Sequence, residues 1–348
     1  MRFSPRSENT LRDPILIPVN DPSAAGEARR AAVALAAAAG FDEPHQGRVA
    51  LVATEVTTNL VKHARGGETI IRTLSAGEGG GIEVLAVDRG PGIADLARCL
   101  QDGYSTAGTA GAGLGAIRRL SDLFDVTSVP AAGTALVARV RGERAEPVPS
   151  AGIDFGAVCL PTAGEDANGD GWAVETRPNR SAVLVVDGLG HGLLAATAAR
   201  EAVRVFRQTA DREPVDIIQA LHGALRPTRG GAAAVAVIDH AARALRFAGI
   251  GNIAGAVVAV GRRQGLVSLA GTLGHAVRKV QTFEYAWPPG AVLVMHSDGL
   301  GSQWDLTRYP GLTARHPALV AGVLFRDFRR ERDDLTAFAA RDAQGATP

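Results

Sequence analysis

The sequence predicts an α+β protein with two domains. Its 348 residues exceed what a single hydrophobic core usually needs, so two cores are expected. A polar stretch with two prolines, residues 143–150, separates the halves. The second half is rich in strands and has two internal helices, which predicts two packed sheets flanked by helices. We therefore expect domains at residues 1–142 and 152–348, joined by a linker at 143–151.

Composition excludes several classes of protein. Lys and Arg number 37 and Asp and Glu 36, a formal net charge of +1, so neither nucleic acid nor an anionic membrane is an expected partner. Cys99 and Cys159 have no metal-ligand spacing and suggest no disulfide framework, which fits a reducing compartment. The polar N-terminus lacks a signal core, and no uncharged apolar run is long enough to span a bilayer. We expect a cytoplasmic protein.

The N-terminal half begins with a short strand and two helices. Pro18 favours an edge position for a strand at Ile15–Val19. An Ala-rich helix follows from Pro22 to Gly40, and a second runs from about Glu43 to Ala64. The second helix has apolar residues at helical spacing that predict one buried face: Val49, Val52, Ala53, Val56, Leu60 and Ala64.

Three polar or glycine-rich motifs follow one another in this half. Glu55 and Asn59 lie one helical turn apart, where they could orient a hydroxyl and ligate Mg²⁺. A strand at Ile82–Val87 ends in Asp88, followed by Gly-Pro-Gly at 90–92. Glycines at 108–115 open a helix expected at Ala116–Leu123, where backbone N–H groups can approach phosphate. Each motif alone also fits an exposed pair or a plain turn, but their order makes a stronger signal.

This half resembles the GHKL ATPase fold, in the RsbT-like branch of bacterial anti-sigma factors and switch-protein serine kinases. The resemblance covers about Ile15 to Arg141 and a Bergerat-type α/β sandwich that binds ATP. It rests on Ala53-Thr54-Glu55, Asn59 to Ala64, Asp88 to Ile93 and Gln101 to Thr106.

The resemblance also implies residue roles in the first domain. Asn59 would bind Mg²⁺, Asp88 would read the adenine amino group, and Glu55 would be the general base for a serine hydroxyl. The glycines expected beside the nucleotide are Gly90, Gly92, Gly111, Gly113 and Gly115, the last three at the phosphates. Residues 93–109 would form the lid. The sequence does not distinguish a working kinase from an ATP-gated binding domain, since both need this pocket.

Two hydrophobic strands in the second half each end in Asp-Gly. Val183–Val186 runs into Asp187-Gly188, and Val292–Met295 is followed shortly by Asp298-Gly299. A buried strand that ends in this way presents a carboxylate at its tip while glycine lets the backbone bend. Asp170 lies at the start of a strand expected to pair with the one ending at Asp187, so the two carboxylates should converge, although an acidic turn also fits a solvated loop.

The remaining elements of this half are three helices and five strands. The helices are expected at Leu193–Thr209, Pro214–Leu225 and Pro317–Phe328, and the strands at Phe155–Leu160, Ala232–Ile238, Ala244–Gly249, Gly255–Val260 and Leu335–Ala339.

Four acids beside strand ends suggest a metal site: Asp170, Asp187, Asp298 and Asp333 or Asp334. An oxygen donor set without a Cys/His set favours Mg²⁺ or Mn²⁺ over zinc. Two such ions can activate a water and neutralise a phosphoryl group. We expect His191 to orient its turn and His296 to be packed, with a ligand role for either left open.

This half resembles the SpoIIE/RsbX branch of metal-dependent Ser/Thr protein phosphatases over about Gly152 to Arg341, which implies an αββα sandwich. The motifs are Gly169 to Trp172, Val186 to Gly192, Gly249 to Ile253, Ser297 to Leu300 and Arg332 to Thr336. By resemblance, Asp187 would bridge two metals with the Gly188 carbonyl, Asp298 and Asp333 would ligate one metal, and Asp170 would lie close by. Asp333 is preferred to Asp334 because the family's closing motif has its first acid on the metal. No motif assigns an arginine to the substrate phosphate, and 262–278 is a candidate substrate flap.

The resemblances together imply a phosphoserine/phosphothreonine phosphatase fused to an ATP-binding switch-kinase domain. The expected partner is a STAS-domain protein of a partner-switching pathway, either an anti-sigma antagonist or a stressosome-type protein. The alternative is a non-catalytic, ATP-gated module that sequesters such a partner, and the intact acids argue against it. Homodimer formation and the choice between Mg²⁺ and Mn²⁺ are left open.

Overall fold

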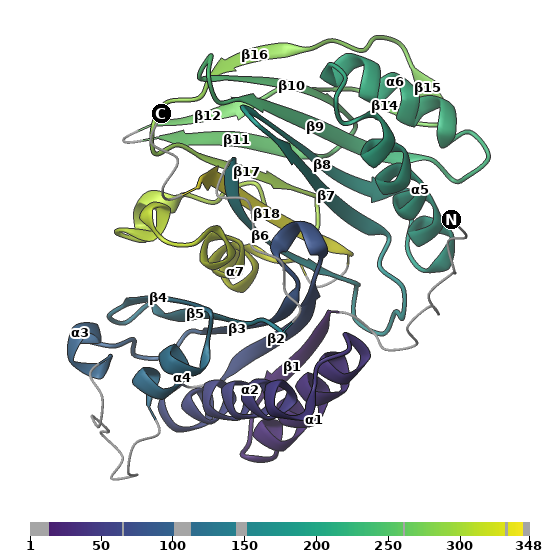
Figure 1. Cartoon of the computed structure of the whole chain (residues 1–348). Coiled ribbons are helices and arrows are strands. Elements are labelled where there is room, and N and C mark those ends of the chain that lie inside the picture. The colour runs from purple at the N-terminus through teal and green to yellow at the C-terminus, as the bar shows by residue number, and fades with distance from the viewer. Residues whose placement is uncertain are drawn as a thin grey trace. The chain divides into compact units, whose positions relative to one another are not determined.

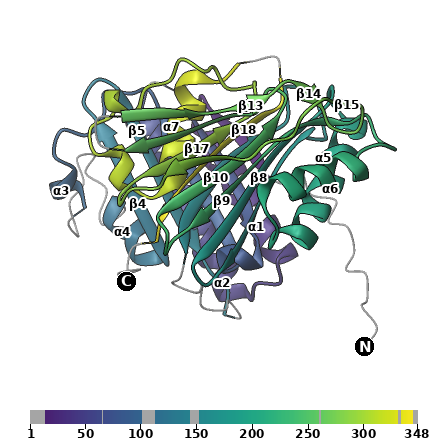
Figure 2. The ribbon, with the colours of Figure 1, turned by 90° about the horizontal axis from the view of Figure 1, so that it is seen from above.

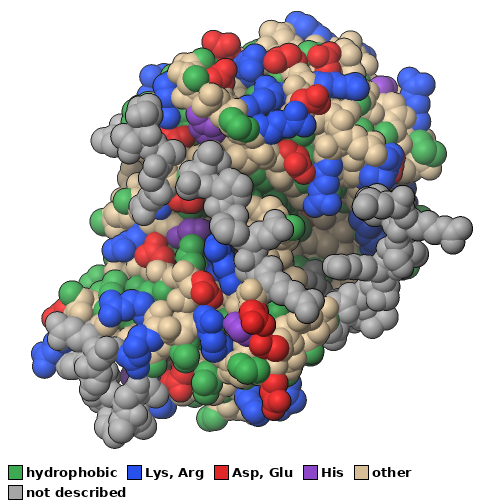
Figure 3. Space-filling model, viewed as in Figure 1, with side chains coloured by type: hydrophobic (Ala, Val, Ile, Leu, Met, Phe, Trp, Pro, Cys, Tyr) green, Lys and Arg blue, Asp and Glu red, His purple; other side chains and the backbone are tan. Residues whose placement is uncertain are grey.

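The computed structural model describes residues 14–64, 66–100, 113–143, 152–259, 262–330 and 333–343. The chain divides into two compact units (Figure 1). The N-terminal unit comprises Met1–Phe124 and Ser128–Pro147, and the C-terminal unit comprises Asp125–Thr127 and Val148–Pro348. Basic and acidic side chains are interspersed on the face seen in Figure 3, in keeping with a net charge near zero.

The N-terminal unit is a five-stranded sheet with helices on one face (Figure 1). The strand order is β1-β2-β3-β5-β4, so β1 lies at an edge as Pro18 predicted. The strands are β1 (Ile15–Val19), β2 (Gly67–Leu74), β3 (Gly81–Asp88), β4 (Leu123–Val129) and β5 (Gly133–Val140). The helices are α1 (Ser23–Ala38), α2 (Glu43–His63), α3 (Leu96–Cys99) and α4 (Leu114–Leu120), with a 3₁₀ turn at Ala76–Glu78.

Helix α2 carries the predicted buried face. The Asp42 carboxylate caps its first turn by accepting a hydrogen bond of 2.9 Å from the His45 backbone N–H. Val49, Val52, Ala53, Val56 and Leu60 are buried as expected, whereas Ala64 lies just beyond the helix.

The helix predicted at Ala116–Leu123 was wrong at both ends. It begins at Leu114 and ends at Leu120, and Leu123 begins β4, a strand that the sequence did not reveal. The backbone N–H of Asp122 donates to the Arg139 carbonyl at 2.8 Å. Pairing with the sheet therefore replaces the helical hydrogen bonds that these residues would otherwise make.

In the part of the C-terminal unit that the structure describes, a six-stranded and a five-stranded sheet are accompanied by three helices (Figure 1). One sheet has the order β13-β10-β9-β8-β7, with β16 added on β10, and the other has the order β12-β11-β17-β18-β6. The strands are β6 (Ile153–Leu160), β7 (Asp170–Arg177), β8 (Arg180–Gly188), β9 (Gly231–Asp239), β10 (Ala244–Ile250), β11 (Ala254–Ala259), β12 (Arg262–Leu266), β13 (Ser268–Leu269), β14 (Gly271–Thr272), β15 (Ala276–Val277), β16 (Phe283–Ala286), β17 (Val292–His296) and β18 (Leu335–Asp342). The helices are α5 (Leu193–Thr209), α6 (Pro214–Ala224) and α7 (Pro317–Phe328), with 3₁₀ turns at Leu306–Arg308 and Leu312–Ala314.

Side chains of β8 alternate between two cores. Leu184 and Val186 pack with α5 and α6, which lie side by side in Figure 2, whereas Val183 and Val185 pack against the second sheet. A strand covered on both faces needs an uninterrupted apolar run, which explains its sequence. Helix α7 covers β6 and β18, so the layers are helix, sheet, sheet and helix, as predicted.

No helix among the described residues combines the length and the apolarity that a membrane crossing requires. The candidate flap at 262–278 is largely built into the unit, since β12 pairs with β11 and β13 pairs with β10. The β14–β15 hairpin is a separate two-stranded ladder, and Leu273 at its turn is buried and paired with Gly231 at the start of β9.

A single glycine sets how closely α7 approaches β6. A Cβ on Gly156 would overlap the backbone of Ala318, near the start of α7. We expect Gly156→Ala to lower the free energy of unfolding of the C-terminal unit by about 1–3 kcal/mol, as overpacking does. Gly223→Ala, on α6 where a Cβ meets open space, should instead raise it by about 0.5–1 kcal/mol. Urea unfolding of the two variants measures both changes, and equal stability of the two would contradict this account.

Candidate functional site

Sheet register brings the first two predicted acids together. Asp170 is the first residue of β7 and lies directly opposite Asp187, near the end of β8. The predicted convergence of these carboxylates is therefore confirmed. Gly188 follows at once, and a Cβ there would overlap the carbonyl of Ala195, so glycine is required where the strand passes beneath α5.

Asn252 joins Asp187 to a third acid. Its side-chain nitrogen donates one hydrogen bond to Asp187 Oδ2 at 3.0 Å and another to Asp298 Oδ2 at 2.8 Å. Asp298 follows β17 on the second sheet, so the amide links carboxylates from both sheets. Sequence reasoning quoted the Gly-Ile-Gly-Asn turn at 249–252 but gave Asn252 no role. The available signal was that Asn252 is a polar residue just after β10, which lies two strands from β8 in the same sheet.

Asp333 and Asp334 do different work. Asp334 is buried and its two oxygens each accept a backbone hydrogen bond of 2.7 Å, from Thr162 and from Gly169. It therefore fastens the loop that leads to Asp170. The Asp333 carboxyl lies beside Asp298, and burial together with that neighbour's charge raises its pKa. Asp333 is therefore exposed beside Asp298, whereas Asp334 is engaged with the backbone, and the choice between them as a ligand stays a prediction.

Within the part of the chain that the structure describes, the acid cluster contains an unpaired carboxylate oxygen and carboxyl groups with raised pKa values. Asp170 Oδ2 accepts a hydrogen bond of 2.6 Å from Ser297 Oγ, but its buried Oδ1 has no hydrogen-bond partner among the described residues. Burial, and then the charge of Asp187, raises the pKa of Asp170 well above its usual range. The pKa of Asp187 rises to about 7, first through burial and then through the charges of Asp298, Asp333 and Asp334.

The donor chemistry of these acids suits divalent cations, although no three Asp, Glu, His or Cys side chains of the described residues are already gathered as a metal-binding group. The acids offer oxygen ligands, and a cation would supply the positive charge that lets buried carboxylates ionise side by side. An unpartnered, buried carboxylate oxygen is the kind of atom that such an ion satisfies.

Both histidines of the motifs have partners. The exposed ring of His191 lies with Nδ1 2.7 Å from Glu165 Oε1, a contact that holds the turn after Gly188. His296 is buried: its Nδ1 donates to the Ser297 carbonyl at 2.8 Å and its Nε2 accepts from Trp304 Nε1 at 3.1 Å. With both ring nitrogens engaged, His296 is packed as expected.

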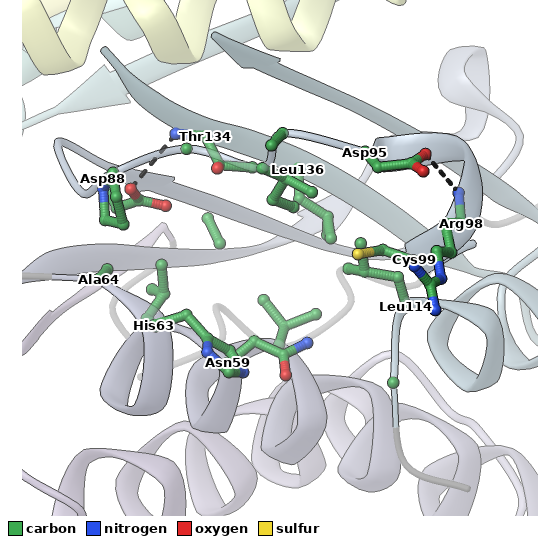
Figure 4. Close-up of a pocket in the computed structure, with 18 residues that line it drawn as sticks. Asn59, His63, Ala64, Asp88, Asp95, Arg98, Cys99, Leu114, Thr134 and Leu136 are labelled. Carbon is green, nitrogen blue, oxygen red and sulfur yellow. Dashed lines mark hydrogen bonds between the residues drawn. The ribbon is translucent and has the colours of Figure 1, made fainter. Parts of the chain in front are cut away.

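The N-terminal unit contains a cavity of about 440 Å³ (Figure 4). It lies between α2, the end of β3, the loop into α3 and the start of α4, and its size suits a small-molecule ligand. Asn59 and His63 border it from α2, and Asp88 borders it from β3. Asp88 Oδ1 accepts backbone hydrogen bonds from Gly90 at 2.7 Å and Thr134 at 3.3 Å, which fix the carboxylate.

The predicted nucleotide residues distribute unevenly around this cavity. Asn59, Asp88, Gly92 and Gly113 line it, whereas Gly115 is buried within α4. Glu55 lies one turn before Asn59, partly exposed and apart from the lining. Gly111 and the motif at 101–106 lie outside the described residues. The sequence did not single out Thr134, which reaches the cavity only because β5 pairs with β3.

Two family models match the chain. The model described as a histidine kinase-like ATPase domain matches residues 19–140, and the one described as stage II sporulation protein E (SpoIIE) matches residues 177–341. The second match includes Asp187, Asp298 and Asp333 and begins after Asp170.

Similar proteins are known for both parts. The serine/threonine-protein kinase RsbT of Bacillus subtilis (strain 168) is 35% identical over 99 residues, which are 28% of this chain and 74% of that protein. A solved structure of the bacterial stressosome, described as a modular system adapted to control secondary messenger signalling, has a TM-score of 0.52. It is 25% identical and the match covers 55% of this chain and 100% of that one.

These findings define the class of protein: a histidine kinase-like ATPase domain joined to a SpoIIE-type phosphatase domain. The predicted fold class is confirmed for both domains. The chain belongs to the RsbT family through its ATPase domain, and its second domain matches the SpoIIE model.

The acid cluster predicts a pH-dependent response to cations. A carboxyl whose pKa is raised in the folded state contributes stability below its unfolded pKa, near 4, and loses it as the pH rises through the folded value, about 7 for Asp187. With a chelator present, the C-terminal unit should therefore melt at a lower temperature at about pH 8 than at about pH 5.

Mg²⁺ or Mn²⁺ should raise this melting temperature more at the higher pH, where the ionised acids need the charge. Asp187→Asn should reduce both the pH dependence and the response to cations. Calorimetric melts with and without the ion give the result, and an ion effect that is equal at both pH values would refute it.

Proposed function

We propose that the C-terminal domain hydrolyses phosphoserine or phosphothreonine at a centre of two divalent ions. Asp187 would hold both ions and Gly188 would contribute its carbonyl. Asp298 and Asp333 would hold one ion, with Asp170 close by, directly or through a water. The observation that carries this proposal is the buried Oδ1 of Asp170, which has no partner among the described residues and lies on the residue opposite Asp187.

When bound, two such ions supply an activated water and neutralise charge on the phosphoryl group. The chain's own residues hold the ligands in place. Asn252 fixes the carboxylates of Asp187 and Asp298, and Asp334 fixes the backbone at Thr162 and Gly169. Such supporting hydrogen bonds keep ligands oriented before an ion arrives.

For the N-terminal domain we infer that the cavity binds ATP with Mg²⁺. Asn59 would hold the ion, Asp88 would read the adenine amino group, and Gly90, Gly92, Gly111, Gly113 and Gly115 would lie around the nucleotide. Glu55 would be the base that accepts the proton of a serine hydroxyl. The cavity with Asn59 and Asp88 on its wall and the 35% identity to a serine/threonine-protein kinase support this assignment.

We infer that both domains act on one STAS-domain regulator in a partner-switching pathway, the kinase-like domain adding a phosphate and the phosphatase domain removing it. The similarity to RsbT and to a structure of the bacterial stressosome supports this partner class. A domain pair with opposite reactions on one residue would set the regulator's phosphorylation state by the balance of its two rates.

Loss of the central acid should abolish the phosphatase reaction. Full-length protein with Mn²⁺ should release phosphate from p-nitrophenyl phosphate and from a phosphorylated STAS protein. Asp187→Asn should lower kcat/KM by at least roughly a hundredfold because it removes the shared ligand. Asp211→Asn, on the turn between α5 and α6, is the matched control and should act like the wild type. Phosphate release by the wild type no faster than by Asp187→Asn would sink the phosphatase assignment, and a silent wild type that still binds its partner would point to a sequestering module.

The kinase assignment has its own pair of variants. Radiolabelled ATP and unphosphorylated STAS protein should give transfer that Glu55→Ala abolishes while ATP still binds, since Glu55 lies apart from the cavity lining. Asn59→Ala should weaken ATP binding itself, measured by calorimetry with Mg²⁺. If Glu55→Ala labels the partner as fast as the wild type does, Glu55 is not the base.

A further inference from the structure

Exposed leucines gather beside the acid cluster. Six large hydrophobic side chains of the described residues are strongly exposed, and three of them lie within six consecutive positions. These are Leu189, Leu193 and Leu194, with exposed fractions of 54%, 71% and 56%. They flank the turn that follows Asp187-Gly188, and we call them the apolar rim.

The fold does not need the apolar rim. Leu193 and Leu194 are the first residues of α5, and the inward face of that helix is already formed by alanines from Ala195 to Ala202, followed by Val205 and Phe206. Leu189 is likewise exposed although its backbone N–H is bound to the Gly230 carbonyl at 2.9 Å. Single exposed leucines are ordinary, but a group of them at one edge of a site indicates an interaction surface.

Arg229 stands next to the apolar rim. Its Nη1 lies 3.1 Å from where a Cβ on Gly190 would be, and its guanidinium makes no ion pair or hydrogen bond with the side chains that the structure describes. Its backbone is held firmly, since the Arg229 carbonyl lies 2.8 Å from His275 Nε2 and the next N–H donates to Thr228 Oγ1 at 3.0 Å. A fixed backbone therefore presents an uncommitted cation over the turn that follows Asp187.

The charge balance of the site suits the Arg229 guanidinium to binding a phosphate group. Four carboxylates carry at most four negative charges, which two divalent ions would balance. A phosphate monoester then brings up to two further negative charges, and a guanidinium is a strong, two-pronged donor to phosphate oxygens. Arg229 supplies positive charge at the edge of the site where the phosphoryl group would enter.

We propose that Arg229 and the apolar rim form the substrate-docking surface of the phosphatase domain. The occupant is a protein segment whose phosphoserine or phosphothreonine has apolar residues on either side. A protein substrate must lie across the residues that border the phosphoryl site, and Leu189 is only two positions beyond Asp187. The inference rests on the proposed phosphatase function and adds to it the kind of sequence that is dephosphorylated.

Two phosphoserine peptides test the apolar part. They are identical except that leucine and valine flank the phosphoserine in one and serine and asparagine in the other, and p-nitrophenyl phosphate serves as a third substrate. The full-length protein with Mn²⁺ should have a kcat/KM about tenfold higher for the apolar peptide, which corresponds to partial burial of one or two such side chains. The Kd values of the matching phosphonate peptides, which cannot be hydrolysed, should differ likewise.

The double variant Leu193→Ser with Leu194→Ser should bring both ratios close to one. Val267→Ser, which replaces another exposed hydrophobic residue of the same unit, should keep them. Equal kcat/KM and equal Kd for the two peptides in the wild type overturn the proposal. Failure of the wild type on p-nitrophenyl phosphate would instead count against the phosphatase function itself.

Arg229→Ala should raise the Kd of both phosphonate peptides about tenfold or more, because it removes a charged phosphate contact, and Arg229→Lys should recover part of the loss. Arg226→Ala removes another exposed arginine three residues away and should leave both Kd values as they are. If Arg229→Ala binds the peptides as Arg226→Ala does, Arg229 does not hold the phosphate.

Discussion

Mutual repulsion among neighbouring carboxylates is the constraint around which the C-terminal domain is built. Acids from strand ends on two sheets come near one another there: Asp170 is buried, Asp187 and Asp298 are half-buried, and Asp333 is exposed. The domain holds them by rigid means: strand register for Asp170 and Asp187, a shared amide for Asp187 and Asp298, and backbone hydrogen bonds from Asp334 for the adjoining loop. Either protonation or a bound cation would relieve the repulsion within this group of acids.

Local sequence patterns were enough for much of this architecture. The ranges predicted for α5 and α7 agree with the structure, and the apolar run before Asp187 is a strand covered on both faces. These elements succeed because their periodicity and their glycine or proline boundaries are strong. The local pattern failed at β4. Its first residue was expected to end a helix, but pairing with β5 makes the segment a strand.

The candidate sites show the same division. Acids at strand ends can be recognised in the sequence because their position relative to the strand defines where they point. Asn252 also follows a strand, but its partners are 65 and 46 residues distant, and only the sheet pairing shows which acids it bridges. Arg229 belongs to no recognisable sequence motif. The exposure of Leu193 and Leu194 can be recognised only once the buried face of α5 is known.

The shared amide of Asn252 has a consequence for the durability of the protein. Asparagine is among the least heat-stable side chains, because its amide hydrolyses slowly to a carboxylate. At this position the lesion would replace a donor to two acids with a fifth negative charge between them. An aged molecule of this kind would repel its own ligands, and it would need a cation merely to remain folded where the fresh protein needs one to react.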